Sequence, residues 1–163
     1  MPKALVSDFS RVILLPVDGT YTGGLNPLHR TLSEQGPYDF FAYFKLNTEL
    51  LDFYKSIVTL LPLYVLTEGT IQEHPALQEH LQGIFREIFS CSRLGKKKDD
   101  PDSYRWIAEH IGVAPHEILY IDDLASNIDT ARKAGMIGIQ HISNEDVIRQ
   151  IQAAMQLHIT KIV

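Results

Sequence analysis

Cysteine is almost absent from this sequence of 163 residues, which contains Cys91 alone. A single cysteine cannot form a disulfide within the chain, and no second cysteine or histidine stands near it at the spacing of a zinc site. The sequence therefore does not resemble a disulfide-stapled domain or a structural zinc module. A reducing compartment fits this composition, and we expect a cytoplasmic protein.

Long apolar runs are lacking as well. The longest, residues 57–66, is interrupted by Thr59, Pro62 and Tyr64 and is too short to cross a bilayer. The apolar run that follows Met1-Pro2-Lys3 is too short for the core of a secretory leader. We therefore expect no membrane partner.

The sequence also has no excess of positive charge, because 15 Lys and Arg residues face 20 Asp and Glu residues and give a formal net charge of −5. Surfaces that bind nucleic acids usually gain affinity by neutralising phosphates with Lys and Arg. The one basic run, residues 96–98, is followed at once by Asp99 and Asp100, which is typical of a solvated loop. Nucleic acid is not an expected partner.

Apolar segments of strand length alternate with segments of helical periodicity after about residue 45, and this order predicts a parallel sheet covered by helices. One globular domain, residues 1–163, is expected from the length. Asp100-Pro101 and Gly112 mark the clearest helix start and stop. The predicted strands are residues 4–6, 63–66, 118–121 and 136–141, with a weaker one at 88–89, and the predicted helices are about residues 50–61, 101–111, 125–134 and 143–155.

Residues 11–46 form a contrasting segment, rich in glycine, proline and aromatic residues and without a long periodic pattern. We predict an elaborated loop inserted within the domain. The aromatic residues between Tyr38 and Phe44 give it apolar surface that can pack, so it is not expected to be a linker.

Polar side chains follow three of the predicted strands. Asp8, Thr67 and the pair Asp122-Asp123 stand at strand ends, and Lys98 precedes the helix before the third strand. Ligands of open parallel sheets bind beyond the carboxyl ends of the strands, so these residues are expected to converge. Clustered carboxylates would repel one another unless a hard cation such as Mg²⁺ lay between them. A lysine and a threonine beside that cation favour a phosphate.

In this order, Asp8-Phe9-Ser10, Thr67, Lys98 and Asp122-Asp123, the sequence resembles the four motifs of the haloacid dehalogenase (HAD) superfamily. The most specific stretch runs from Lys98 through residues 99–112 to residues 121–127 and on to Ala134-Gly135. The resemblance covers nearly the whole chain. It implies a three-layer, doubly wound α/β fold with a parallel sheet (a HAD-like Rossmannoid), in which residues 11–46 form a minimal cap.

The resemblance also implies roles for these residues in a Mg²⁺-dependent phosphatase. Asp8 would attack phosphorus and form an aspartyl-phosphate, and Thr67 and Lys98 would bind the phosphoryl oxygens. Asp8, the backbone carbonyl of Ser10, and Asp123 helped by Asp122 would hold Mg²⁺. Two points stay open from the residues alone: Lys97 could replace Lys98, and Arg11 could either contact a substrate anion or be an ordinary surface arginine.

Ser10 departs from the family pattern, because HAD phosphatases usually carry at this position a second aspartate that protonates the leaving group and later activates water. A serine hydroxyl is a poor acid or base near neutral pH, and losing such a group costs roughly 10²- to 10⁴-fold in rate. Three outcomes remain: a substrate whose leaving group needs no proton, an acid from the inserted segment, with Asp18, Tyr21 or His29 as candidates, or loss of turnover. The last would leave a protein that binds a phosphorylated ligand without hydrolysing it.

The short inserted segment also bears on the substrate. It cannot build a full helical cap domain, so the site is expected to be open on one side. A phosphorylated small molecule or a phosphoprotein could therefore be the substrate, and a second copy of the chain could close the site as a homo-oligomer.

Overall fold

The computed structural model describes residues 1–156, so the end of the predicted domain, residues 157–163, lies outside the described residues. Its centre is a parallel sheet of five strands in the order β5-β4-β1-β6-β7. Every residue of β1, β4 and β6 is buried, as expected for strands covered on both faces. The predicted parallel sheet is confirmed, and its strands are β1 (Ala4–Ser7), β4 (Leu63–Thr67), β5 (Glu87–Ser90), β6 (Ile118–Asp122) and β7 (Ile137–Gln140).

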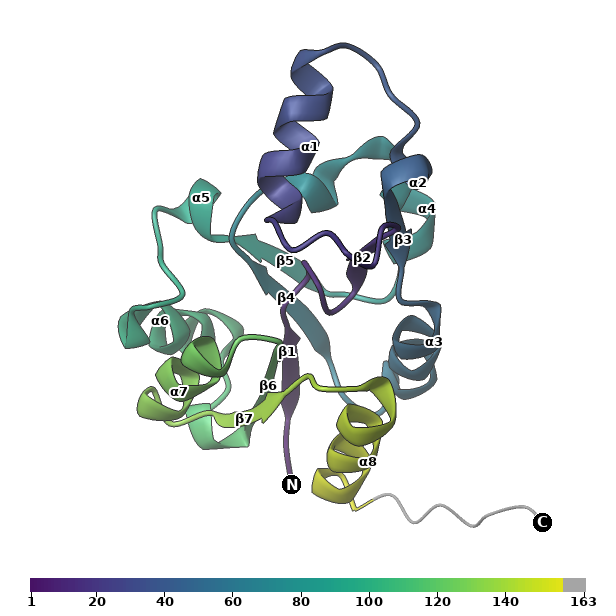
Figure 1. Cartoon of the computed structure of the whole chain (residues 1–163). Helices are drawn as coiled ribbons and strands as arrows, with labels where there is room; N and C mark the ends of the chain where they lie inside the picture. Colours follow the sequence, from purple (N-terminus) through teal and green to yellow (C-terminus); the bar gives the residue numbers. More distant parts are fainter. Residues whose placement is uncertain (157–163) are drawn as a thin grey trace, which may run out of the picture.

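Helices cover both faces of this sheet and give three layers (Figure 1). Residues of β1 alternate between two apolar cores: Leu5 packs with the core that holds α3 (Thr48–Ile57) and α8 (Asn144–Ala154). Ala4 and Val6 pack with the core that holds α6 (Pro101–Ile111) and α7 (Ala125–Lys133). The side-chain period of two along a strand thus places one helical layer on each face, which confirms the predicted fold class.

Local capping explains where these helices begin and end. The Asp100 side chain accepts a hydrogen bond from the Asp102 N–H, and Pro101 occupies the first helical position of α6. Gly112 ends that helix with a φ of 70°, a left-handed conformation that favours glycine. Ser143 caps α8 through the Asp146 N–H, and Asn47 caps α3.

The segment 11–46 contains regular structure, so its prediction as a loop was wrong in this respect. Strands β2 (Leu14–Pro16) and β3 (Phe44–Leu46) pair antiparallel at its base, and between them lie α1 (Leu25–Glu34) and the short α2 (Phe40–Tyr43). The helix α1 buries Leu25 and packs Leu28 and Leu32 against the core at helical spacing, but Gly24 and Pro27 at its start suggest a turn. The predicted aromatic packing is present, because Phe40 and Phe44 are buried with ring centroids 4.8 Å apart.

The inserted segment lies above the end of the sheet where the parallel strands finish (Figure 1). Short elements complete the path between the strands: the 3-10 helices Ile71–Glu73, Pro75–Leu77 and Pro115–Glu117, and the helices α4 (Gln78–Leu81) and α5 (Cys91–Leu94). Among the described residues, no helix combines the length and the apolar character that crossing a bilayer would need.

Candidate active site

The sheet brings the strand-end residues together. Ser7 of β1 is in register with Val65 of β4 on one side and with Ile121 of β6 on the other. Asp8, Thr67 and Asp122 therefore end three adjacent strands at the same edge. One carboxylate oxygen each from Asp8, Asp122 and Asp123 lies within 4.8 Å of the other two.

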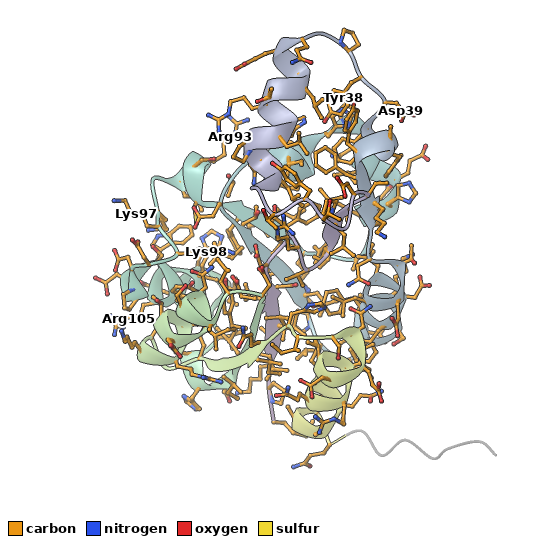
Figure 2. All side chains as sticks on the ribbon, viewed as in Figure 1. Tyr38, Asp39, Arg93, Lys97, Lys98 and Arg105 are labelled. Carbon is orange, nitrogen blue, oxygen red and sulfur yellow. The ribbon has the colours of Figure 1, made fainter. Side chains whose placement is uncertain are left out.

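Lys98 lies between two of these carboxylates. Its Nζ is 2.6 Å from Asp8 Oδ1 and 3.0 Å from Asp122 Oδ2, and all three side chains are buried. The Tyr104 hydroxyl in α6 donates to the Lys98 carbonyl at 2.9 Å and fixes the turn that directs this lysine inward. Lys97 is exposed, and Figure 2 shows it at the periphery of the molecule. The ion pairs are therefore made by Lys98 and not by Lys97.

Burial and the neighbouring charges shift the pKa values of Asp8, Lys98 and Asp123. Burial raises the pKa of Asp8 to about 7, while Lys98 acts to lower it and Asp122 to raise it. Burial alone would lower the pKa of Lys98, but the two neighbouring carboxylates raise it above its ordinary value. Burial, and then the negative charge of Asp122, raises the pKa of Asp123. The arrangement is a concentration of buried negative charge that one ammonium group only partly offsets.

Asp122 is the most completely hydrogen-bonded of the three acids. Its Oδ2 accepts from the Tyr120 hydroxyl at 2.6 Å, and Oδ1 accepts from the Leu124 N–H at 2.9 Å. The Asn127 amide, in the first turn of α7, donates to both oxygens at 3.1 and 3.2 Å. Asp122 is thus held rigidly, whereas Asp123 lines a pocket.

This pocket, of about 330 Å³, opens beside the carboxylates. Two of the polar atoms that border it, Thr67 Oγ1 and Ser10 Oγ, are buried and have no hydrogen-bond partner. Buried hydroxyls are normally paired, so these two are available to a ligand. Three carboxylates suit a hard divalent cation, and the hydroxyls together with Lys98 suit an oxyanion beside it. The residues present therefore fit a metal and phosphate pair. The lining is Asp8, Ser10, Arg11, residues 22–27, Thr67, Glu68, Asp123, Leu124 and Asn127.

Arg11 lines the pocket but already has partners. Its Nη2 donates to the carbonyls of Tyr21 at 2.9 Å and Gly23 at 2.6 Å, and its backbone φ is 64°. These hydrogen bonds lie within the inserted segment, between its first residue and the turn before α1. Contact with a substrate anion stays a prediction, and it would require the remaining N–H groups.

The three residues of the inserted segment considered as acids are engaged away from this pocket. Asp18 is exposed and accepts hydrogen bonds from Thr20, which lower its pKa. The Tyr21 hydroxyl donates to the Gly24 carbonyl. His29 Nδ1 is 2.6 Å from the Tyr38 hydroxyl. None of the three candidates lines the pocket that holds Asp8.

Two contributors were missed by the sequence reasoning. Tyr120 stands two residues before Asp122 in β6, so both side chains point to the same face, and this spacing was a usable signal. Glu68 also lines the pocket, directly after Thr67. Asn127 was noted only as part of a motif, and its contact with Asp122 shows why it is there.

Comparison with known proteins supports the resemblance to this family. The model of the family described as haloacid dehalogenase-like hydrolase matches residues 65–140, which contain Thr67, Lys98 and the Asp122-Asp123 pair. Over this stretch, just under half of the chain, the protein is similar to HAD-like hydrolases. The resemblance inferred from the motifs is thereby confirmed.

Curated relatives of this HAD-like chain include enolase-phosphatases E1. The protein of Aquifex aeolicus is 34% identical over 86 residues, 50% of this chain and 38% of that protein. The protein of Pectobacterium atrosepticum is 33% identical over 101 residues, 58% of this chain and 43% of that protein. The chain therefore spans about two fifths of the length of these relatives.

Solved structures share the fold over most of the HAD-like chain. A HAD-superfamily hydrolase of subfamily IA from Geobacter sulfurreducens superimposes with a TM-score of 0.65 at 15% identity, covering 92% of this chain and 100% of that one. A HAD family enzyme from Bacteroides thetaiotaomicron, in complex with magnesium and inorganic phosphate, gives a TM-score of 0.62 at 13% identity, covering 86% and 94%.

Proposed function

We propose that this chain is a Mg²⁺-dependent phosphatase that acts through an aspartyl-phosphate on Asp8. The observation that carries the proposal is the meeting of Asp8, Lys98 and Asp123 beside the unpaired hydroxyl of Thr67 at one edge of the sheet. The Bacteroides enzyme of the same fold was crystallised with magnesium and inorganic phosphate, and the Aquifex relative is an enolase-phosphatase. Both support this assignment.

Each residue then has a defined task. The Asp8 carboxylate attacks phosphorus, Thr67 Oγ1 donates to a phosphoryl oxygen, and the Lys98 ammonium offsets the charge of the phosphoryl group. Asp8, Asp123 and the Ser10 carbonyl would hold Mg²⁺, with Asp122 as a further carboxylate in reach. The bound cation would neutralise charge on the phosphoryl oxygens and so favour approach of the nucleophile.

We also propose that residues 11–46 form a minimal cap over this pocket. Support comes from residues 22–27, which line it opposite the carboxylates, with Leu25 buried. A cap of this size leaves room for a phosphorylated small molecule or for a phosphorylated side chain of a protein. A second copy of the chain could cover the open side, and a light-scattering mass of one chain would contradict that.

Ser10 favours a second candidate function, the binding of a phosphorylated ligand without turnover. Its hydroxyl lies where a carboxyl acid would be expected, and a hydroxyl cannot exchange protons efficiently near neutral pH. Such a protein would keep the metal and phosphate contacts and lose the second half of the reaction.

Phosphate release from aryl phosphates such as p-nitrophenyl phosphate, with Mg²⁺ or with a chelator, separates the candidates. Turnover that needs Mg²⁺, is lost in Asp8→Asn and persists in Asp99→Asn supports the phosphatase. Asp99 is an exposed carboxylate next to Lys98 and serves as the matched control. Binding of phosphate or a metallofluoride without turnover would favour the second candidate, and neither binding nor turnover would overturn both.

A further inference from the structure

Hydrolysis of an alkyl phosphate requires a proton for the leaving oxygen, and Ser10 is a poor source. Five ionisable or hydroxyl-bearing side chains considered as proton donors can be excluded. Ser10 and Thr67 have alcohol protons that are not acidic enough, and Asp18, Tyr21 and His29 are bonded elsewhere. The donor must therefore be sought among the remaining residues that line the pocket.

Four charged side chains line this pocket among the described residues: Asp8, Arg11, Glu68 and Asp123. Asp8 is the nucleophile and Asp123 a metal ligand in the proposed function. Arg11 cannot release a proton in a protein and is bonded to backbone carbonyls. Glu68 is the carboxyl group to which no task has been given.

The position of Glu68 suits a group that exchanges protons with a substrate. It follows Thr67 directly, and its backbone carbonyl accepts a hydrogen bond from the Ser92 N–H at 3.0 Å, which fixes the main chain there. Its side chain is exposed and makes no hydrogen bond or ion pair with any described residue. The carboxyl group is therefore free to turn toward a leaving group at the pocket mouth.

The cap holds the chain next to Glu68 firmly. Asn26 Oδ1, at the start of α1, accepts from the N–H groups of Thr70 and Ile71 at 3.0 Å each. Gly69 permits this approach, because a Cβ there would lie 2.2 Å from Asn26 Oδ1, 2.4 Å from its Cγ and 2.8 Å from its Nδ2. Glu68 thus stands at a fixed point between the sheet edge and the cap, where the non-phosphate part of a substrate would leave.

We propose that Glu68 is the proton donor and acceptor of this phosphatase, in place of the aspartate that Ser10 has replaced; the proposal rests on the proposed function. In the first half-reaction the bond between Asp8 Oδ and phosphorus forms, the bond between phosphorus and the leaving oxygen breaks, and the Glu68 carboxyl proton passes to that oxygen. In the second, water attacks phosphorus and gives a proton to the Glu68 carboxylate, the bond to Asp8 breaks, and phosphate is released.

The acidity of the leaving group tests this role. A proton donor speeds the release of a poor leaving group, such as an alkoxide, much more than the release of a good one. Removing the donor should therefore make the rate depend more steeply on leaving-group pKa.

The test compares Glu68→Gln with wild type on two substrates. One is p-nitrophenyl phosphate, whose leaving group needs no proton, and the other is an alkyl phosphate with an uncharged alkyl group, such as phenethyl phosphate. We expect the rate at which the leaving group is released in the first turnover to fall by roughly 10²- to 10⁴-fold for the alkyl phosphate and to change by less than about threefold for the aryl phosphate. Steady-state turnover should fall on both substrates, because Glu68 also accepts the proton of the attacking water in the second half-reaction. Glu79→Gln is the matched control, because Glu79 is exposed in α4 and lines no part of this pocket. Circular dichroism verifies that both variants are folded.

Equal losses of the first-turnover rate on both substrates, or no loss on the alkyl phosphate, would overturn the role of Glu68 as the proton donor. Wild-type turnover of the aryl phosphate alone would also overturn it, because no acid would then be working. Failure of the proposed function looks different: wild type and Asp8→Asn would then show the same activity on every substrate. A second readout is the slope of the logarithm of the first-turnover rate against leaving-group pKa, which should become steeper in Glu68→Gln and not in the control.

Discussion

The buried acids at the bottom of the pocket and the proposed cap above it (residues 11–46) are built by different means. The bottom of the pocket, its floor, joins Asp8, Lys98 and Asp122: the sheet register places the two acids, and ion pairs join Lys98 to both. The proposed cap bonds to the loop after β4 through a single side chain, Asn26, which accepts from two backbone N–H groups. Buried charge makes the floor intolerant of change, whereas the exposed cap can move or vary at small cost.

The largest effect is expected from breaking the floor with Lys98→Met. The change leaves two buried carboxylates without their cation, and we expect the free energy of unfolding to fall by about 3 to 5 kcal/mol in the absence of Mg²⁺. Urea denaturation measures it. Lys97→Met is the control, because Lys97 is exposed, and it should stay within about 0.5 kcal/mol of wild type. Similar values for the two variants would contradict the structural role of the Lys98 ion pairs.

A smaller loss is expected from Tyr120→Phe. The hydroxyl donates to the buried Asp122 carboxylate, and a hydrogen bond to a charged group contributes about 1.5 to 3 kcal/mol. Tyr54→Phe is a matched comparison on the other side of the sheet, because the buried Tyr54 hydroxyl donates to the neutral Ser7 Oγ at 3.0 Å. That bond should contribute about 0.5 to 1.5 kcal/mol. If thermal or urea unfolding shows a larger loss of stability in Tyr54→Phe than in Tyr120→Phe, the Tyr120 hydroxyl does not stabilise the Asp122 carboxylate as expected.

Asn26→Ala should loosen the cap and leave the floor intact. Two backbone N–H groups lose their acceptor, and about 1 kcal/mol of local stability corresponds to roughly fivefold more frequent opening. Limited proteolysis should therefore cleave within residues 11–46 about fivefold faster, while the urea midpoint changes little. Ser33→Ala in the same helix is the control, since its hydroxyl bonds only within α1. Unchanged cleavage in Asn26→Ala would show that other contacts hold the cap.

The smallest effect concerns pH and two neighbouring histidines, His29 in α1 and His74 in the loop after β4, whose ring centroids are 5.6 Å apart. Burial lowers the pKa of His29, with a further lowering by His74, and burial lowers the pKa of His74. Because the folded state disfavours their charged forms, their contribution to stability is complete above about pH 6.5 and is lost as pH falls through the lowered values. Both residues are half-buried, so solvent still screens them and keeps the effect below about 1 kcal/mol. Melting temperatures below pH 6.5 should fall less in His29→Gln than in wild type, and an identical fall would exclude His29.

Much of the sheet could be predicted because its strands are buried on both faces and read as continuous apolar runs, as in Leu63–Thr67. Helices that begin at an N-cap residue and end at a glycine, such as α6, could be predicted equally well. The helix α1 was not predicted, although Leu25, Leu28 and Leu32 stand at helical spacing, because the glycines and proline at its start are typical of a turn. Its stability depends on contacts such as that of Asn26 with the loop after β4, which no local pattern shows.

The carboxylates of the floor could be predicted because each ends a strand. The choice of Lys98 over Lys97 could not, since it depends on how the turn before α6 directs each side chain. The contact of Tyr120 with Asp122 could have been predicted, because residues two apart in a strand such as β6 lie on the same face. Glu68 was not, because its place at the pocket depends on how Gly69 and Asn26 meet across distant segments.

The antiparallel pairing of Leu14 with Leu46 has a consequence for the history of this chain. Because the segment leaves and re-enters the domain at this pair of strands, its ends stay close together whatever its length. The entropic cost of closing such a loop grows only slowly as residues are added. Insertions or exchanges between β2 and β3 can therefore diversify what the protein recognises without disturbing the sheet that carries the carboxylates.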